Sequence, residues 1–208
     1  DWKEDAERRD FTFNALYMDK NGTIYDYYNG VEDLMNKKVK FVGSANDRIQ
    51  EDALRILRYY RFACRFQAFN TDEEATQAIA KNIHLVKDLS AERILMEMTK
   101  IFNSDAQHFA ITEMRNNGLD KIIFGENGFN NYYDYTQEVK PSYLYSFALI
   151  AHEKDYMRKF KASSEEIDFI NKVLDQETID LTEHKIREML FKKYSPEMIQ
   201  AKALLSDL

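Results

Sequence analysis

The sequence predicts a mainly α-helical chain that begins with a short β-containing piece. Near the start, apolar and polar residues alternate over 11–18 and 23–27, on either side of a turn signal at 19–22. From about residue 47 the apolar spacing becomes helical. The only two prolines, Pro141 and Pro196, suit the first turn of a helix. We therefore expect a hairpin followed by an array of helices.

The predicted elements can be placed in chain order. A third strand is expected at 38–42. Helices are expected at 48–66, 72–83, 90–103, 105–117, 141–153, 155–161, 164–175, 182–193 and 196–207. Gly118 is a predicted C-terminal cap, and Ser163 with Glu166 forms a predicted capping box. The tract 124–140, rich in Gly, Asn, Tyr and Asp, is the expected boundary within the helical part, which gives domains at 1–46, 47–123 and 124–208.

Composition indicates an intracellular globular chain, and we expect it in the cytoplasm. The 208 residues are 44% hydrophobic, which is too apolar for a disordered segment, and no apolar run approaches the ~20 residues of a membrane span. One cysteine, Cys64, excludes an internal disulfide, and four scattered histidines give little support for a zinc site. The net charge of −7 argues against a general nucleic-acid coat but leaves room for a local basic patch.

The run from Glu51 to Phe62, EDALRILRYYRF, carries the most specific chemistry. On a helix, Asp52 and the arginines at 55, 58 and 61 would form a ladder of neighbours. A carboxylate beside a guanidinium matches a base edge with an amino donor next to a ring-nitrogen acceptor, which cytosine and adenine both have. The alternative is a solvated helix face with weak ion pairs.

A second segment favours the first interpretation. Several short motifs follow one another along the chain: RRDFTFNAL (8–16), G-x-x-x-D (22–26), G-x-x-DL (30–34), EDALRILRYYRF (51–62) and SAERI (90–94) with Glu97. Their order resembles that of the bacterial tRNA nucleotidyltransferase (CCA-adding enzyme) and poly(A) polymerase family, class II. The resemblance covers roughly the first hundred residues. It implies the end of a nucleotidyltransferase head at 1–46, a helical neck for base recognition at 47–123 and a helical body at 124–208.

The resemblance also implies roles for individual residues. Arg9 would contact the nucleoside triphosphate, Asp52 and Arg55 would pair with C or A, and Arg58 and Arg61 would line the triphosphate site. Supporting roles fall on Asp10, Asn14, Glu51, Glu92, Arg93 and Glu97. Asp26 and Asp33 match an intervening motif, where turn capping and catalysis remain alternatives. Tyr132, Tyr133 and Tyr135 would either stack on RNA bases or pack between helices.

The family's metal-binding part is missing from this sequence. Its members hold two magnesium ions on an Asp-x-Asp pair and contact phosphate with a glycine-rich turn, both upstream of the RRD motif. Neither an Asp-x-Asp spelling nor a Gly-Gly pair occurs here. We therefore expect no catalytic or metal-binding residue in this chain, Mg²⁺ bound by an absent head, and no activity by the chain alone. A separate head-domain chain would be one partner.

The expected function is selection of CTP and ATP for addition to a tRNA 3′ end, with tRNA or another RNA as the partner and no membrane involved. Two alternatives remain open. One is a poly(A) polymerase or an enzyme restricted to CC or A addition. The other is a noncatalytic helical module that binds RNA or a protein and has lost the head.

Overall fold

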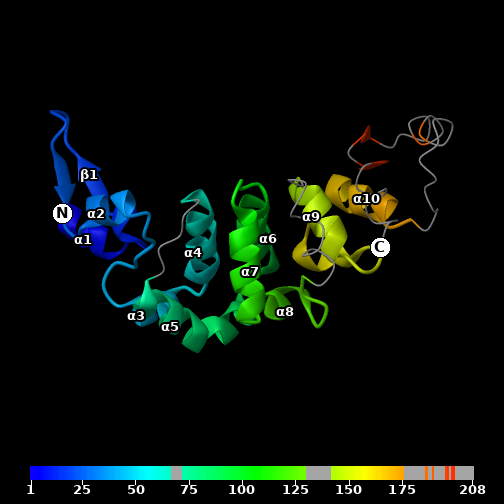
Figure 1. Cartoon of the computed structure of the whole chain (residues 1–208), viewed down its shortest axis with the longest axis horizontal. Helices are drawn as coiled ribbons and strands as arrows, with labels where there is room; N and C mark the ends of the chain where they lie inside the picture. The colour runs from blue at the N-terminus through cyan, green and yellow to red at the C-terminus, as the bar shows by residue number, and fades with distance from the viewer. Residues whose placement is uncertain are drawn as a thin grey trace.

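The computed structural model describes residues 1–66, 72–129 and 142–175, with a few further positions between 186 and 199. The described elements form a row, with the hairpin piece at one end and helices α9 and α10 toward the other (Figure 1). Mainly helical architecture with a short β-containing end is thus confirmed. No helix of the described residues is long and apolar enough to cross a bilayer.

The N-terminal piece contains α1 (Trp2–Glu7), a 3₁₀ turn η1 (Thr12–Asn14), strands β1 (Leu16–Met18) and β2 (Ile24–Asp26), and α2 (Gly30–Met35). The two strands pair antiparallel, so the predicted hairpin is confirmed. The strand predicted over 11–18 is wrong in its first half. There the Asp10 carboxylate accepts hydrogen bonds from the Phe11 N–H and the Asn14 amide, which bend the backbone into η1.

The third predicted strand, at 38–42, is also wrong. Among the described residues it is reduced to an isolated antiparallel bridge between Phe11 and Phe41. Two backbone hydrogen bonds flank that bridge, from the Thr12 N–H to the Lys40 carbonyl and from the Val42 N–H to the Asp10 carbonyl, both 3.0 Å long. This pairing fixes the RRD motif against the segment that leads into the next helix.

The helix predicted over 48–66 is divided in two. Helix α3 (Ala45–Glu51) ends at Asp52, whose backbone is extended at φ −156° and ψ 104°, and α4 (Leu54–Arg65) begins beyond it. The Asp52 carboxylate accepts a hydrogen bond from the Leu54 N–H at 3.1 Å, as a capping side chain does. Asp52 therefore does not lie on the same helix as Arg55, and the predicted four-residue ladder is wrong at its first member.

Three of the helices that follow agree with the prediction, namely α5 (Glu73–Asn82), α6 (Ala91–Phe102) and α7 (Gln107–Asn116). The 3₁₀ helix η2 (Ile83–Asp88) and helix α8 (Leu119–Phe124) are not among the predicted elements. Gly118 has φ +78°, the left-handed conformation that ends a helix, so its predicted role is confirmed. Helices α4 and α6 pack side by side (Figure 1), which brings two charged helix faces together.

The C-terminal described part contains α9 (Tyr143–Ile150), η3 (Tyr156–Phe160) and α10 (Ser164–Val173). The predicted capping box is confirmed, because Ser163 and Glu166 exchange hydrogen bonds of 2.7 and 3.3 Å. The three tyrosines at 132, 133 and 135 lie outside the described residues, as do nearly all of the helices predicted at 182–193 and 196–207.

One apolar cluster runs through the described chain. It extends from Phe11 in the N-terminal piece to Val173 in α10. Helix α4 contributes a buried face that includes Ile56, Leu57 and Tyr60. Cys64 is buried there too, and burial raises the pKa of its thiol to about 11, so it serves as a small core residue. The opposite face of α4 carries the arginines.

Candidate functional site

A cleft of about 500 Å³ lies between the RRD segment and helix α4. Its lining residues are Arg8, Arg9, Asp10, Asn14, Asp52, Leu54, Arg55, Arg58, Phe62 and Arg93. Five of them are arginines and two are acids, so the cleft carries a positive charge on a chain whose net charge is −7. It brings together seven of the residues that the motifs single out, drawn from three separate segments.

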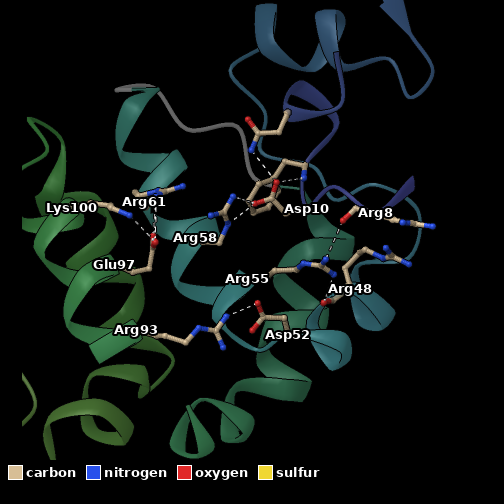
Figure 2. A network of polar contacts seen from close by, with 12 residues as sticks. Arg8, Asp10, Arg48, Asp52, Arg55, Arg58, Arg61, Arg93, Glu97 and Lys100 are labelled. Atoms are coloured by element: carbon tan, nitrogen blue, oxygen red, sulfur yellow. Dashed lines mark hydrogen bonds and ion pairs between the residues drawn. The ribbon is translucent and has the colours of Figure 1, made fainter. Parts of the chain in front are cut away.

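Arg58 is held by Asp10 (Figure 2). Its Nε lies 2.6 Å and its Nη2 2.5 Å from the Asp10 Oδ2. The other oxygen of Asp10 accepts from the Phe11 N–H and the Asn14 amide, each at 2.9 Å. The Asp10 carboxylate is buried and fully engaged, so it orients Arg58 and the RRD turn. Asn14 takes part in the same network.

Asp52 is held from across the cleft by helix α6. Its Oδ2 lies 2.7 Å from Nη2 of Arg93 (Figure 2). Its Oδ1 accepts a hydrogen bond from the Leu54 N–H at 3.1 Å. Both partners are partly exposed, at 33% for Asp52 and 44% for Arg93. Since each carboxylate oxygen has two lone pairs, Asp52 keeps capacity to accept a further donor from the cleft.

Arg55 is anchored by acceptors on the side of α3. Its Nη1 donates to the Glu51 carboxylate at 2.7 Å and to the Arg48 carbonyl at 2.8 Å, and its Nη2 approaches the Arg8 carbonyl at 3.3 Å. Arg48 pairs with the same Glu51 at 2.7 Å. These contacts fix the guanidinium at the rim of the cleft. Within the described part of the chain, the Arg55 and Asp52 side chains are not hydrogen bonded to each other, although the Arg55 N–H donates to the Asp52 carbonyl at 3.0 Å.

Arg9 lies at the open edge of the cleft. Its Nη2 donates to Asp5 at 2.6 Å, and its guanidinium lies 6.0 Å from the ring centroid of Tyr17. Hydrogen bonds, from the Tyr17 hydroxyl foremost and then from Arg9, hold the pKa of the Asp5 carboxyl below its usual range. About half of the Arg9 side chain is exposed. Among the cleft arginines that form an ion pair in the described structure, Arg9 has the most exposed side chain.

Arg61 lies apart from these residues. Its guanidinium faces α6, where Nη1 lies 3.1 Å from Glu97, and Glu97 also accepts from Lys100 at 3.1 Å (Figure 2). The Glu97 side chain is only 1% exposed. Burial lowers the pKa of Arg61, an effect that outweighs the opposing influence of Glu97. The motifs predict Arg61 in the same triphosphate site as Arg58, whereas the structure places it in a neighbouring cleft.

Three further candidates, Glu92, Asp26 and Asp33, do not line the cleft and instead make contacts with other parts of the fold. Glu92 is exposed and pairs with Lys161 on the side of α10, away from the cleft. Asp26 accepts hydrogen bonds from the N–H groups of Gly30 at 2.8 Å and Val31 at 3.0 Å, so it caps α2. Asp33 accepts from the Thr12 hydroxyl at 2.7 Å. The contacts of Asp26 favour turn capping over catalysis, whereas Asp33 makes a structural contact between α2 and η1.

The cleft does not suit a divalent cation. Such ions need several free carboxylate or carbonyl oxygens. Asp10 and Asp52 are each paired with an arginine, and the described residues contain no group of three His, Cys, Asp or Glu side chains that could hold a metal. Five arginines suit an anion with many oxygens, such as a phosphate chain.

Sequence reasoning missed four residues of the site. Arg8, Leu54 and Phe62 line the cleft, and Arg48 shares Glu51 with Arg55. Arg8 belongs to the RRD motif and Phe62 ends the EDALRILRYYRF motif, so their positions in these motifs could have identified them as site residues. Arg48 lies three residues before the ED-x-x-R motif. It comes close to the Arg55 side chain only because the end of α3 lies beside the start of α4.

Two family models match parts of the chain. Residues 1–40 match the poly A polymerase head domain, and residues 68–127 match a segment described as the probable RNA and SrmB-binding site of polymerase A. Among curated proteins, the mitochondrial CCA tRNA nucleotidyltransferase 1 of Mus musculus is 50% identical over 107 residues, which are 50% of this chain and 25% of that protein. The CCA-adding enzyme of Streptococcus uberis is 43% identical over 100 residues, which are 48% and 25% of the two chains.

Solved structures extend the similarity to nearly the whole chain. The CCA-adding enzyme of Bacillus stearothermophilus, solved with CTP, has a TM-score of 0.78 at 24% identity and covers 99% of this chain and 55% of its own. The Thermotoga maritima CCA-adding enzyme, complexed with tRNA, has a TM-score of 0.69 at 19% identity over 99% of this chain and 57% of its own. At these identities the structures show a shared fold.

The chain therefore has a fold that these nucleotidyltransferases share over nearly its whole length. More specifically, the matches confirm the resemblance to the tRNA nucleotidyltransferase and poly(A) polymerase family that the motifs indicate. The match to the curated relatives named above spans only about a quarter of their length.

Proposed function

We propose that this chain is the base-selecting part of a template-independent RNA nucleotidyltransferase that adds C and A to the 3′ end of tRNA. One observation carries the proposal. Asp52 and Arg55, the acid and the first arginine of the ED-x-x-R motif, line one arginine-rich cleft together with Arg9 and Arg58. The similar enzymes solved with CTP, with ATP and with tRNA support these substrate classes.

In this proposal the Asp52 carboxylate accepts a hydrogen bond from the amino group of the incoming base. Arg55 donates to the adjacent ring nitrogen. Cytosine and adenine present this order of donor and acceptor, whereas uracil and guanine present the reverse. Each such bidentate contact contributes about 1 to 3 kcal/mol of discrimination. A base entering the cleft would either share Asp52 with Arg93 or displace it, which a partly exposed ion pair permits.

The triphosphate would lie against the remaining arginines. Arg58 is oriented by the buried Asp10, so little rotational freedom is lost when it binds a phosphate. Arg9 is exposed enough at the cleft edge to turn from Asp5 to a ligand oxygen. This proposal does not assign Arg61 to the triphosphate, because its guanidinium pairs with Glu97 in the other cleft.

If Mg²⁺ takes part, as the resemblance implies, carboxylates of a head domain would hold it, and it would supply stabilisation of the charge that develops during nucleotidyl transfer. The cleft residues described above do not fit that ion, so we assign no metal to them and route no step through it. Their contribution is binding and orientation of the nucleotide. A head that completes the site, in the same chain or as a separate partner, remains a prediction.

Nucleotide incorporation tests the proposal. The full-length protein that contains these residues should extend a tRNA transcript lacking its 3′ CCA with CTP and ATP, and not with UTP or GTP. The 208-residue chain should extend it with none of the four and should regain CTP and ATP use when a head segment is added. Extension with ATP alone would favour a poly(A) polymerase or A-adding enzyme. Binding of RNA without any incorporation would favour a noncatalytic module.

A further inference from the structure

A second cleft, of about 520 Å³, lies between the C-terminal halves of α4 and α6. Its lining residues are Arg61, Phe62, Arg65, Lys100, Asn103 and Ser104. Three of these six side chains are cationic and none is acidic. The cleft is therefore a basic site distinct from the one formed by the RRD and ED-x-x-R motifs, and the function proposed above does not use it.

The charge of this cleft is only partly neutralised. Glu97 lies buried between Arg61 and Lys100 and pairs with both. One carboxylate against three cations leaves a net charge of about +2 at the cleft surface. Arg65 is exposed and has no ion pair with any residue in the described part of the chain. Its guanidinium is thus available to a ligand, together with the amide of Asn103.

The two clefts adjoin across one aromatic ring. Phe62 lines both, with the Arg61 guanidinium 4.4 Å and the Arg58 guanidinium 5.8 Å from its ring centroid. Arg58 and Arg65 lie seven residues apart on α4, which corresponds to a rise of about 10 Å. A nucleic-acid strand that ends at the first cleft could therefore reach the second within a very few nucleotides.

We propose that the second cleft binds a backbone phosphate of the RNA strand whose 3′ end is extended at the first cleft. This inference rests on the function proposed above and names where its RNA partner is held. Arginine, lysine and amide donors are the groups that position nucleic-acid backbones. The triphosphate of a nucleotide in the first cleft is already matched by Arg9 and Arg58. The segment described as a probable RNA-binding site, residues 68–127, contains three lining residues of this cleft, Lys100, Asn103 and Ser104. Arg61 and Arg65 precede that segment, and we assign them to the same contact.

A structural explanation of the positive charge makes a different prediction. Both α4 and α6 end beside this cleft, and basic residues in a last helical turn stabilise the helix dipole without any ligand. Lys81 offers a matched comparison, because it is an exposed basic residue in the last turn of α5 and lines neither cleft. If the dipole were the whole explanation, loss of charge at Arg65 and at Lys81 would have the same small effect.

The test compares Arg65→Gln with Lys81→Gln in the full-length protein. The probe is a tRNA transcript lacking its 3′ CCA, and its dissociation constant is measured by fluorescence anisotropy at several salt concentrations. We expect Arg65→Gln to raise that constant about 3- to 10-fold and to reduce the slope of log K against log salt by about 0.7, the value for one contact to a single strand. Lys81→Gln should leave both unchanged, and Arg65→Lys should restore most of the affinity.

Three results would overturn the inference. They are an unchanged RNA affinity in Arg65→Gln, an equal loss in Lys81→Gln, or a rise in the KM for CTP at unchanged RNA affinity. The last of these results would assign the second cleft to the triphosphate of the incoming nucleotide. Because RNA binding is measured without turnover, these outcomes are separate from failure of the proposed function, which would appear as absent CTP and ATP incorporation by the wild-type protein.

Discussion

The carboxylate of Asp52 and the guanidinium of Arg93 lie 2.7 Å apart, although 41 residues separate them in sequence. The contact joins the break between α3 and α4 to the first turns of α6. It holds one Asp52 oxygen while the Leu54 N–H holds the other. The acid that is proposed to read the base is therefore oriented by two separate elements.

We predict that Arg93→Ala lowers kcat/KM for both CTP and ATP several-fold in the full-length protein, because Asp52 loses the donor that fixes its rotamer. The pair is partly exposed, so the free energy of unfolding should change by less than about 1 kcal/mol. Steady-state kinetics and urea denaturation check the two parts. Higher affinity for CTP in Arg93→Ala would instead mean that Arg93 competes with the base for Asp52.

A second prediction concerns the buried acid between α4 and α6. Glu97→Ala should destabilise the protein by about 3 to 5 kcal/mol, because it leaves the largely buried Arg61 without its counter-charge. Glu92→Ala, on the same helix, removes an exposed carboxylate and should leave the free energy of unfolding nearly unchanged. Urea denaturation of the two variants makes the comparison. Equal stability of both would show that Glu97 is not a structural anchor.

Backbone packing in the N-terminal piece gives a third prediction. A Cβ atom at Gly30 would lie 2.2 Å from the Thr12 carbonyl oxygen and 2.6 Å from its carbon, so the backbone of η1 would have to move. We expect Gly30→Ala to lower Tm markedly, whereas Ala at Gly22, where nothing lies within 4 Å, should cause only the modest strain of its positive φ. Thermal denaturation followed by circular dichroism measures both. A similar Tm in the two variants would contradict the close contact.

The cap of α2 gives a prediction about pH. Burial raises the pKa of Asp26, but hydrogen bonds from the N–H groups of Val31 and Gly30 lower it more, so it lies below the usual value of 3.8. A depressed pKa stabilises the folded state above the unfolded-state value, and this contribution is lost as the pH falls through the folded-state value. Wild type should therefore be more stable than Asp26→Asn at pH 7. The difference should shrink below about pH 4. A constant difference would exclude this linkage.

The motifs alone predict most of the candidate cleft. The RRD and ED-x-x-R segments supply Arg9, Asp10, Asp52, Arg55 and Arg58, and the structure brings all five to one cleft. This agreement is possible because the motif residues were selected for their ability to bind one ligand together, and residues that bind one ligand must lie close in space.

Two differences between the prediction and the structure have physical causes that periodicity does not reveal. The break at Asp52 has neither proline nor glycine nearby, and the Asp52 side chain there is held by the Leu54 N–H and by Arg93, which is far away in sequence. Arg61 faces the second cleft because two successive three-residue steps of about 300° each turn the helix by about 600°, which leaves the Arg55 and Arg61 side chains about 120° apart. That rotation moves Arg61 out of the first cleft and into the second.

The most direct test of the central claim is nucleotide selection by Asp52 and Arg55 variants of the full-length protein, compared with an Asp47→Asn control at an exposed acid of α3. The measured quantity is kcat/KM for each of the four triphosphates on tRNA lacking its 3′ CCA. We predict that Asp52→Asn and Arg55→Ala reduce the preference for CTP and ATP over UTP and GTP by about 10- to 100-fold, which corresponds to 1 to 3 kcal/mol. An unchanged preference in both variants would contradict the assignment of the base-reading pair.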